Sequence, residues 1–228
     1  MKPLRDWDDL PDFMRTEVVR PYYDNLKKHE KELILKRAFD VISASILLVV
    51  LAPAMLVVGI WIKLDSPGPV FFRQTRVTQY GKEFRIFKFR TMVNNAEKLG
   101  TQVTAGDDSR ITKVGSIIRK YRIDEFPQLF NVLAGDMSFV GTRPEVPKYV
   151  KAYSDEMCAT LLLPAGITSE ASIQYKEEDV ILSQVEDIEY SYTTRVLPGK
   201  MCYNLKELKQ FNLFKEALLL LRTVLAVI

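Results

Sequence analysis

One long apolar run dominates the hydrophobic pattern of this chain. From Val41 to Ile62 the sequence carries no charged side chain. As a helix this run would be about 33 Å long, which is close to the hydrocarbon thickness of a bilayer. A buried core helix is the alternative, but helices of soluble proteins seldom run this far without a polar face. The pattern therefore predicts a membrane helix.

Two features of the run bear on how it would meet the membrane. Pro53 removes the hydrogen bond to the carbonyl of Val49 and should kink or break the helix. Lys36 and Arg37 precede the run and Lys63 follows it, so the positive-inside tendency places both ends in the cytoplasm. Two forms remain open: a broken, re-entrant helix within one leaflet, and a Pro-kinked span with the N-terminus outside.

Shorter elements are predicted on either side of this run. Residues 1–35 are polar and interrupted by prolines, which indicates a loosely structured extension or a short helical cap. Alternating apolar and basic residues predict a half-buried strand within Phe84–Phe89, and a helical pattern covers Ile111–Tyr121. Apolar residues at helical spacing over Leu205–Ile228 predict an amphipathic helix, either lying on the membrane or packed on its own domain. The expected fold class is α+β and mostly helical.

Composition narrows the chemistry. The 228 residues include 32 basic and 29 acidic side chains, a net charge of +3, which is too mild to indicate a nucleic-acid partner. The two cysteines lack a CxxC spacing, so a zinc site or a disulfide framework is not expected. The single histidine, His29, lies in a charged run. Catalysis would therefore rest on carboxylates, lysine, arginine, hydroxyls or thiols.

The densest group of candidate residues lies between Arg122 and Glu145. Asp124 and Glu125 are adjacent carboxylates, and their simplest interpretation is the acidic N-cap of a helix that begins near Phe126. A carboxylate can also attack phosphorus, and such a reaction needs cations around the phosphate oxygens. A neighbouring carboxylate could hold Mg²⁺. The cations that could serve are Lys88, Arg90, Arg119, Arg122 and Arg143.

From about Lys36 to its end, the chain resembles the bacterial sugar transferases, also called monotopic phosphoglycosyl transferases. The resemblance is carried by KRAFD before the apolar run, by Pro53, by FKFRTM at Phe87–Met92 and by IDEFPQLFNVLAGDMSFVGTRPE. The last of these runs is long and highly specific.

The resemblance implies a particular architecture and location. Residues 36–64 would form a re-entrant membrane helix broken at Pro53, with both ends cytoplasmic. Residues 65–228 would form a small cytoplasmic catalytic domain with a C-terminal, interfacial amphipathic helix, preceded in the chain by the extension 1–35. The protein would lie on the cytoplasmic face of the bacterial inner membrane, in contact with membrane lipid, and a homodimer is left open.

The resemblance also implies a reaction. The donor would be a UDP-sugar and the acceptor undecaprenyl phosphate. Asp124 would attack the sugar-bearing phosphate and release UMP, and the acceptor would then attack the phosphosugar held on the enzyme. Glu125 would assist, through Mg²⁺ or by activating the acceptor, so both carboxylates are expected metal ligands. The step would begin the membrane-bound assembly of a bacterial glycan.

Further residues match the family's binding motifs. Lys88 and Arg119 match basic residues of its phosphate site, and Arg90 is expected beside them. Arg143 falls at the arginine of a Pro-Arg-Pro motif linked to the uridine nucleotide, with Thr142 in place of the first proline. A larger departure is Pro164–Asp179, where many members have PGITGWAQVNGR; it bears on the choice of sugar or acceptor.

Two other functions are compatible with the sequence: an inactive membrane scaffold of the same fold, and a lipid-binding module without chemistry. The scaffold gives no reason to keep an intact Asp124-Glu125 pair. The lipid-binding module explains the apolar run but not an acidic pair among cations. Release of UMP from a UDP-sugar would separate the transferase from both.

Overall fold

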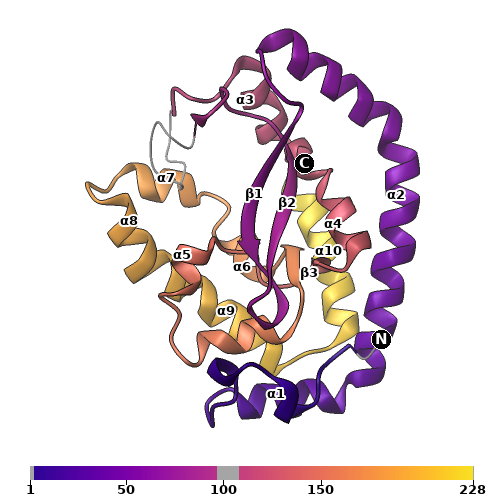
Figure 1. Ribbon diagram of the computed structural model, residues 1–228, viewed down its shortest axis with the longest axis vertical. Helices are drawn as coiled ribbons and strands as arrows, with labels where there is room; N and C mark the ends of the chain where they lie inside the picture. Colours follow the sequence, from indigo (N-terminus) through magenta and orange to yellow (C-terminus); the bar gives the residue numbers. More distant parts are fainter. Residues whose placement is uncertain (1–2, 97–107, 228) are drawn as a thin grey trace.

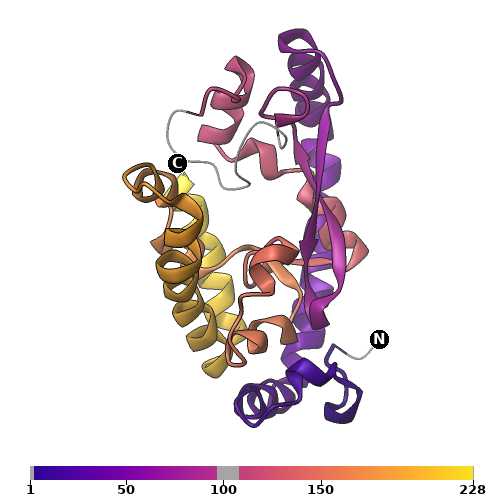
Figure 2. The same ribbon diagram turned by 60° about the vertical axis from the view of Figure 1, so that its left-hand side comes forward.

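The computed structural model describes residues 3–96 and 108–227 of the chain. A long helix runs along one edge, and a two-stranded hairpin lies beside it (Figure 1). Figure 2 shows this helix and the hairpin on one side and the C-terminal helices on the other. In chain order, the main elements are α1 (Arg20–Lys28), α2 (Glu30–Asp65), β1 (Phe71–Val77), β2 (Glu83–Phe89), α3 (Lys113–Lys120), η5 (Ile123–Glu125), α4 (Gln128–Ala134), β3 (Met137–Val140), α5 (Pro147–Val150), η6 (Met157–Leu162), β4 (Ala165–Thr168), α6 (Glu170–Gln174), α7 (Glu178–Ser183), α8 (Ile188–Ser191), η7 (Tyr192–Val196), α9 (Leu197–Lys209) and α10 (Leu213–Val227). Helices with two small sheets make the fold α+β, as predicted.

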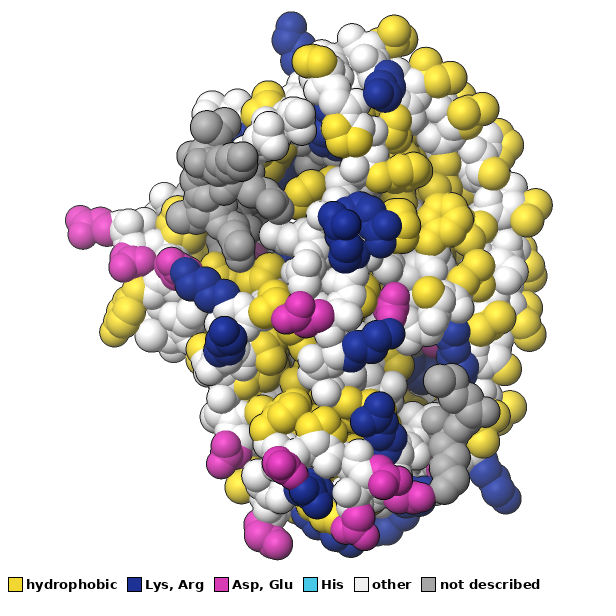
Figure 3. All heavy atoms as spheres, in the orientation of Figure 1, with side chains coloured by type: hydrophobic (Ala, Val, Ile, Leu, Met, Phe, Trp, Pro, Cys, Tyr) yellow, Lys and Arg dark blue, Asp and Glu magenta, His cyan; other side chains and the backbone are white. Residues whose placement is uncertain are grey.

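The predicted apolar helix lies within α2. In the described part of the chain, α2 is the one helix long and apolar enough to cross a membrane. Its mean hydropathy is 2.7 over its most apolar window, and only 6% of that window is buried. Val49 is 77% and Leu64 81% exposed, and Figure 3 shows apolar side chains along this edge. The alternative of a buried core helix is therefore wrong, and α2 presents a surface suited to lipid.

Pro53 lies inside α2, which continues beyond it to Asp65. The helix bends in its C-terminal half (Figure 1). A proline deletes one backbone hydrogen bond and crowds the preceding turn, so Pro53 supplies a physical cause for this bend. A bent but continuous helix is compatible with both topologies that the sequence left open.

The KRAFD segment fastens α2 to the rest of the protein. Lys36 donates a hydrogen bond to the carbonyl of Val140 (2.9 Å) and forms an ion pair with Glu216 on α10 (2.5 Å). Arg37 donates to two carbonyls at the end of α4 (2.6 and 3.0 Å), where a helix lacks its own donors. Asp40 accepts an N–H of β3 (3.2 Å). These bonds join the start of α2 to three elements of the domain.

The hairpin of β1 and β2 confirms the predicted half-buried strand. Its antiparallel register pairs Phe72 with Lys88 and Arg76 with Phe84. Successive side chains point to opposite faces of a strand, so Arg76 and Lys88 share one face. The opposite face includes Arg73, which lies over the ring of Phe87 at 3.7 Å.

Strands β3 and β4 pair in parallel, with Met137 beside Ala165. Beyond β3 the chain comes so near β4 that a Cβ on Gly166 would lie 2.2 Å from the backbone nitrogen of Gly141. The amide of Gly166 donates to the carbonyl of Thr142 (2.9 Å). This close backbone contact fixes the start of the turn that carries Arg143.

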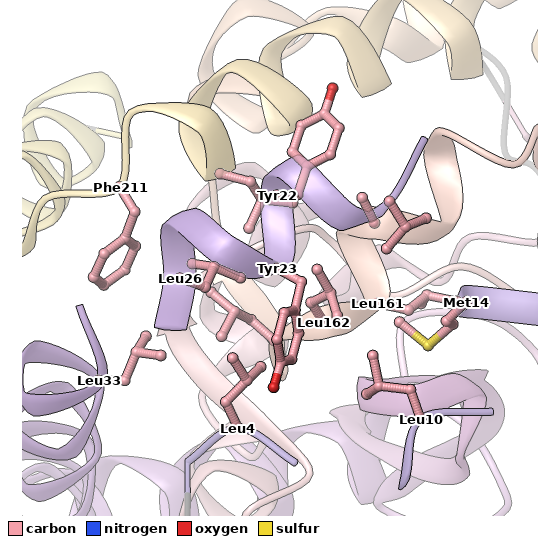
Figure 4. Packing of buried hydrophobic residues seen from close by; sticks show 14 of the residues in the cluster. Leu4, Leu10, Met14, Tyr22, Tyr23, Leu26, Leu33, Leu161, Leu162 and Phe211 are labelled. Atoms are coloured by element: carbon pink, nitrogen blue, oxygen red, sulfur yellow. The ribbon is translucent and has the colours of Figure 1, made fainter. Parts of the chain in front are cut away.

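The N-terminal residues form the helical cap that was one of the two predicted forms. Leu4, Met14 and Leu26 are fully buried, and they pack with Leu162 of η6 and with Phe211 (Figure 4). Because these contacts reach elements far along the chain, the cap is part of the main hydrophobic core at this end of the molecule.

The single C-terminal amphipathic helix predicted over Leu205–Ile228 is wrong. The structure has α9 and α10, separated at Gln210–Asn212. The Asn212 side chain accepts the backbone N–H groups of Phe214 (3.0 Å) and Lys215 (3.2 Å), which is how a helix N-cap works. Ile228 lies outside the described residues.

The two C-terminal helices differ in how much of the predicted apolar stripe they bury. Leu208 on α9 is 7% exposed and packs in the core. On α10, Phe214 (79%) and Leu225 (76%) are exposed. The packed form is therefore correct for α9, whereas α10 keeps an apolar face outward, as an interfacial helix would.

Candidate active site

Asp124 and Glu125 lie in η5, a single 3₁₀ turn between α3 and α4. Arg122 before them has φ 55°, a left-handed conformation that turns the chain sharply. Within the described residues, α4 begins after Pro127 and without a side-chain cap. The N-cap interpretation of the acidic pair is therefore wrong. Instead both carboxylates are buried, with Asp124 at 7% and Glu125 at 8% exposure.

Glu125 is held by cations from three directions. Its Oε1 lies 2.5 Å from Arg143 Nη2, 3.2 Å from Lys88 Nζ and 3.7 Å from Arg122 Nη1. Its Oε2 lies 3.4 Å from Arg143 Nη1. Burial alone would raise the pKa of Glu125, but Arg143 and Lys88 hold that pKa well below its usual range. Glu125 therefore stays ionised and fixed.

Asp124 has a different environment from its neighbour. Its Oδ2 lies 3.7 Å from Lys88 Nζ. Its Oδ1 is buried and has no hydrogen-bond partner among the described residues. Burial raises the pKa of Asp124 above its ordinary value, Lys88 opposes that rise, and the charge of Glu125 adds to it. A buried polar atom without a partner is costly, so Oδ1 is the oxygen that a ligand or reactant would satisfy.

The structure places Lys88 and Arg119 near the acidic pair. Lys88 points from the hairpin between the two carboxylates, and its burial lowers the pKa of its ammonium, against the opposing charge of Glu125. Arg119 lies on α3, which packs against η5. Its positive charge is one of the influences that lower the pKa of Asp124. Lys88 therefore acts on both carboxylates, and Arg119 acts on Asp124.

Arg90 has another role than the predicted one. Its guanidinium donates to the carbonyls of Pro67 (2.6 Å) and Ser66 (2.7 Å) and to the Ser66 hydroxyl (3.0 Å). Only 5% of Arg90 is exposed. It thus fastens the connection between α2 and β1, and the structure does not bring it to the acidic pair.

Arg143 is positioned by its neighbours in space. Its Nη1 donates to the carbonyl of Ile167 on β4 (3.3 Å). The carbonyl of the next residue, Pro144, accepts a hydrogen bond from Arg76 (3.1 Å), and the carbonyl of Glu145 accepts the amide of Val77 (2.9 Å). The turn is therefore braced by β1 and β4, although Thr142 replaces the first proline of the motif.

Arg76 is a residue of the site that sequence reasoning missed. It was not among the candidate cations, but its side chain braces the Arg143 turn, and its charge is among those that lower the pKa of Lys88. The signal was present in the strand pattern, because Arg76 shares a hairpin face with Lys88 once the register is known.

The fit of a magnesium ion to the acidic pair is partial. Among the described residues, no group of three or more His, Cys, Asp or Glu side chains could hold a metal. Asp124 Oδ1 has no protein partner there, and such an oxygen suits Mg²⁺. Both oxygens of Glu125 are engaged by cations. The residues therefore fit an ion that takes one protein oxygen, with the rest from water and substrate phosphates, and not one shared by both carboxylates.

The site as a whole suits chemistry at phosphorus. Within residues 3–96 and 108–227, it offers one buried carboxylate with an oxygen that has no partner, and fixed cations that could hold the nonbridging phosphate oxygens. Cations placed before the reaction lose little energy in reorganising as charge develops. The apolar face of α2 adds a surface suited to lipid.

Comparison with known proteins shows the family of this chain. A family profile described as bacterial sugar transferase matches residues 31–228. The UDP-N-acetylgalactosamine-undecaprenyl-phosphate N-acetylgalactosaminephosphotransferase of Aeromonas hydrophila is 37% identical over 193 residues, which are 83% of this chain and 43% of that protein. The chain thus spans less than half the length of this relative.

Two other relatives are nearer in length. The UDP-glucose:undecaprenyl-phosphate glucose-1-phosphate transferase of Caulobacter vibrioides is 35% identical over 83% of this chain and 68% of its own length. A putative undecaprenyl-phosphate N-acetylgalactosaminyl 1-phosphate transferase of Bacillus subtilis is 43% identical over 58% of this chain and 73% of its own length. With a profile that covers nearly all residues after the N-terminal cap, the chain belongs to the bacterial sugar transferase family.

Proposed function

We propose that this protein transfers a sugar phosphate from a UDP-sugar to undecaprenyl phosphate, through a covalent intermediate on Asp124. The observation that carries the proposal is that Asp124 Oδ1, buried among fixed cations, has no hydrogen-bond partner in the described part of the chain. The names of the relatives support the acceptor, because each includes undecaprenyl phosphate. Their sugars differ, so no sugar is assigned to this chain.

In the first step, a carboxylate oxygen of Asp124 attacks the phosphorus that bears the sugar. A bond from Asp124 to phosphorus forms, the bond from phosphorus to the bridging oxygen breaks, and UMP leaves with that electron pair. Lys88 and Arg143 stabilise the negative charge on the phosphate oxygens as the bond breaks. Glu125 keeps both cations in place, since it is bonded to each of them.

In the second step, a phosphate oxygen of undecaprenyl phosphate attacks the same phosphorus. The bond from phosphorus to Asp124 breaks, the carboxylate is restored, and a sugar linked through a diphosphate to the lipid results. Mg²⁺, if held by Asp124 Oδ1, would supply further positive charge to the phosphates. This transfer would be the first membrane-bound step in the assembly of a bacterial glycan.

We also propose the re-entrant topology, with both ends of α2 and the site on the cytoplasmic face of the inner membrane. The contacts of the N-terminal cap support it, because Leu26 packs with Leu162, which lies beyond α2 in the chain. Residues before and after α2 therefore touch one another. A straight span would place them on opposite sides of the bilayer.

The proposed function is tested by UMP release in detergent, with Mg²⁺, undecaprenyl phosphate and a panel of UDP-sugars. We expect one sugar to give acceptor-dependent turnover. Omission of the acceptor should leave a phosphosugar adduct, visible by intact-mass analysis. A protein that forms neither UMP nor an adduct with any UDP-sugar would favour the inactive scaffold or the lipid-binding module.

Activity should depend on pH within a window narrower than ordinary side chains would give. As pH falls through the raised pKa of Asp124, the carboxylate gains a proton and can no longer attack, so the acid limb should lie above the ordinary 3.8. As pH rises through the lowered pKa of Lys88, a cation is lost, so the basic limb should lie below 10.5. Rates of UMP release against pH give both limbs.

The variant Lys88→Arg provides the control for the basic limb. Arginine keeps its proton throughout this range, so the limb should move to higher pH while the acid limb stays. An unmoved basic limb would show that another group titrates there.

Replacement of Pro53 by alanine should straighten α2. In a fraction of the molecules, the residues before α2 should then lie on the outer face of the membrane. This change would also separate the cap from Leu162, so we expect a lower thermal midpoint. Labelling of Lys28→Cys by a membrane-impermeant maleimide in intact cells, with Cys158 and Cys202 replaced, measures the fraction. Pro21→Ala is the matched control, and equal labelling of both variants would count against Pro53 as the cause of the topology.

A further inference from the structure

A second group of buried charges lies beside the Arg143 turn, and the proposed steps do not use it. Glu145 is 5% exposed, Tyr192 3% and Lys200 6%. These residues come from three places in the chain: the turn after β3, η7 and α9. Charged side chains are seldom buried unless they are paired, so this group needs an explanation.

Lys200 lies at the centre of the group. Its Nζ is 3.0 Å from Glu178 Oε2 and 3.5 Å from Glu145 Oε1. The Tyr192 hydroxyl donates to the same oxygen of Glu145 (2.6 Å) and accepts from Lys200 (3.3 Å). One ammonium therefore serves two carboxylates, and a loss of Lys200 would leave both without it.

Lys200 ties both carboxylates to the turn that carries Arg143. Glu145 follows Arg143 by two residues, and the two line one small cleft together with Tyr153. The pKa of Arg143 is raised chiefly by Glu125, and Asp124 and Glu178 add to the rise. Since such an influence falls off with distance, the carboxylate of Glu178 lies within electrostatic reach of the Arg143 guanidinium.

We propose that Lys200 is a positioning residue of the donor site, which holds the carboxylate of Glu178 against the Glu145 side and away from Arg143. Arg143 is then left to Glu125 and to the diphosphate of the donor. The inference rests on the proposed function, because it assumes that a nucleoside diphosphate binds at Arg143.

The physical reason is competition between anions for one guanidinium. A carboxylate that is partly buried and unpaired gains much by reaching a nearby cation. The Glu178 side chain is 26% exposed and begins the short helix α7, so it can turn more readily than Glu145. Without Lys200, Glu178 would pair with Arg143 and displace the donor phosphates.

This arrangement also connects the divergent segment to the site. Glu178 belongs to Pro164–Asp179, where the chain departs from the family pattern. Lys200 on α9 ties that segment to the turn that carries Arg143. The segment therefore affects the affinity for the nucleotide part of the donor, in addition to any contact with the sugar.

The test compares Lys200→Met with the double variant Lys200→Met/Glu178→Gln. We expect the single variant to raise KM for the UDP-sugar about tenfold and to change kcat less than about threefold. Removing the Glu178 charge as well should bring KM back to within about threefold of the wild type. Lys209→Met, an exposed lysine on the same helix whose side chain is 57% accessible, is the matched control.

The dissociation constant of UDP, measured by calorimetry in detergent, gives a readout that needs no turnover. It should follow the same order as KM. If the double variant binds UDP as weakly as Lys200→Met, or more weakly, Lys200 has only a structural role and the proposal is overturned. A fall in kcat with an unchanged KM would overturn it too.

Glu178→Gln alone keeps the proposal testable if Lys200→Met does not fold. Because it removes the competing anion, this variant should bind UDP as tightly as the wild type or more tightly, and weaker binding would contradict the inference. If wild type and Lys209→Met bind UDP but release no UMP from any UDP-sugar, the proposed function fails. The UDP affinities still decide the role of Lys200 in that case.

Discussion

Replacement of Asp124 by asparagine should abolish turnover and lower kcat by about 10⁴-fold or more. An amide cannot form the bond to phosphorus that the first step requires, although it has the shape of the carboxylate it replaces. The phosphosugar adduct should be absent from the intact mass of the variant when the acceptor is omitted. UMP release at the wild-type rate would disprove the nucleophilic role.

The same variant should be at least as stable as the wild type. Burial raises the pKa of Asp124 in the folded state, so the folded protein disfavours the ionised form, and this cost is present once the pH exceeds that raised pKa. Asparagine carries no charge at any pH, so at neutral pH its thermal midpoint should equal or exceed that of the wild type. Asp155→Asn, which alters an exposed carboxylate, should change neither property.

Replacement of Arg143 by methionine should reduce both activity and stability. Activity, as kcat/KM, should fall by about 10²–10³-fold, as is typical when one group that stabilises a transition-state charge is removed. Stability should fall by about 3–5 kcal/mol, because the buried Glu125 loses its partner at 2.5 Å. Rates of UMP release and thermal midpoints measure the two effects, and Arg195→Met, on an exposed arginine of η7, is the control.

The sign of the pH dependence provides a further check on Arg143. The folded-state pKa of Glu125 is lowered, so its stabilising contribution is present above its unfolded pKa and is lost as pH falls through the folded one. The stability gap between wild type and Arg143→Met should therefore be wide at neutral pH and narrow in acid. Addition of Glu125→Gln should recover stability without activity. If the double variant is no more stable than Arg143→Met, the ion pair with Glu125 is not the source of the lost stability.

The sequence predicted those features that depend on nearby residues. The uncharged run gave α2, and the alternation of apolar and basic residues gave β2, because both patterns follow directly from backbone geometry. The sequence singled out the Asp124-Glu125 pair, but its interpretation as a helix N-cap was wrong. The turn that holds the pair depends on the left-handed conformation of Arg122, which sequence propensity does not favour.

Features that depend on tertiary contacts were harder to predict. Arg90 was named among the cations that could serve the acidic pair, but its long side chain donates to the carbonyls of Ser66 and Pro67 instead. The break before α10 was missed because the apolar spacing runs through it, although Asn212 is a good N-cap residue. Arg76 and Lys200 were overlooked since each acts through contacts that only the folded chain creates.

The way in which KRAFD fastens α2 has a consequence for the meeting of the two substrates. In the proposed reaction, one substrate arrives dissolved in water and the other anchored in lipid, so transfer would require that Asp124 lie at a suitable height above the hydrocarbon. Hydrogen bonds and an ion pair of Lys36, Arg37 and Asp40 join the helix to β3, α4 and α10. That height is therefore fixed by the structure of the protein and not by the thickness of the bilayer. The protein itself would therefore set the distance between Asp124 and the membrane, and the lipid phosphate would have to rise or sink to that level.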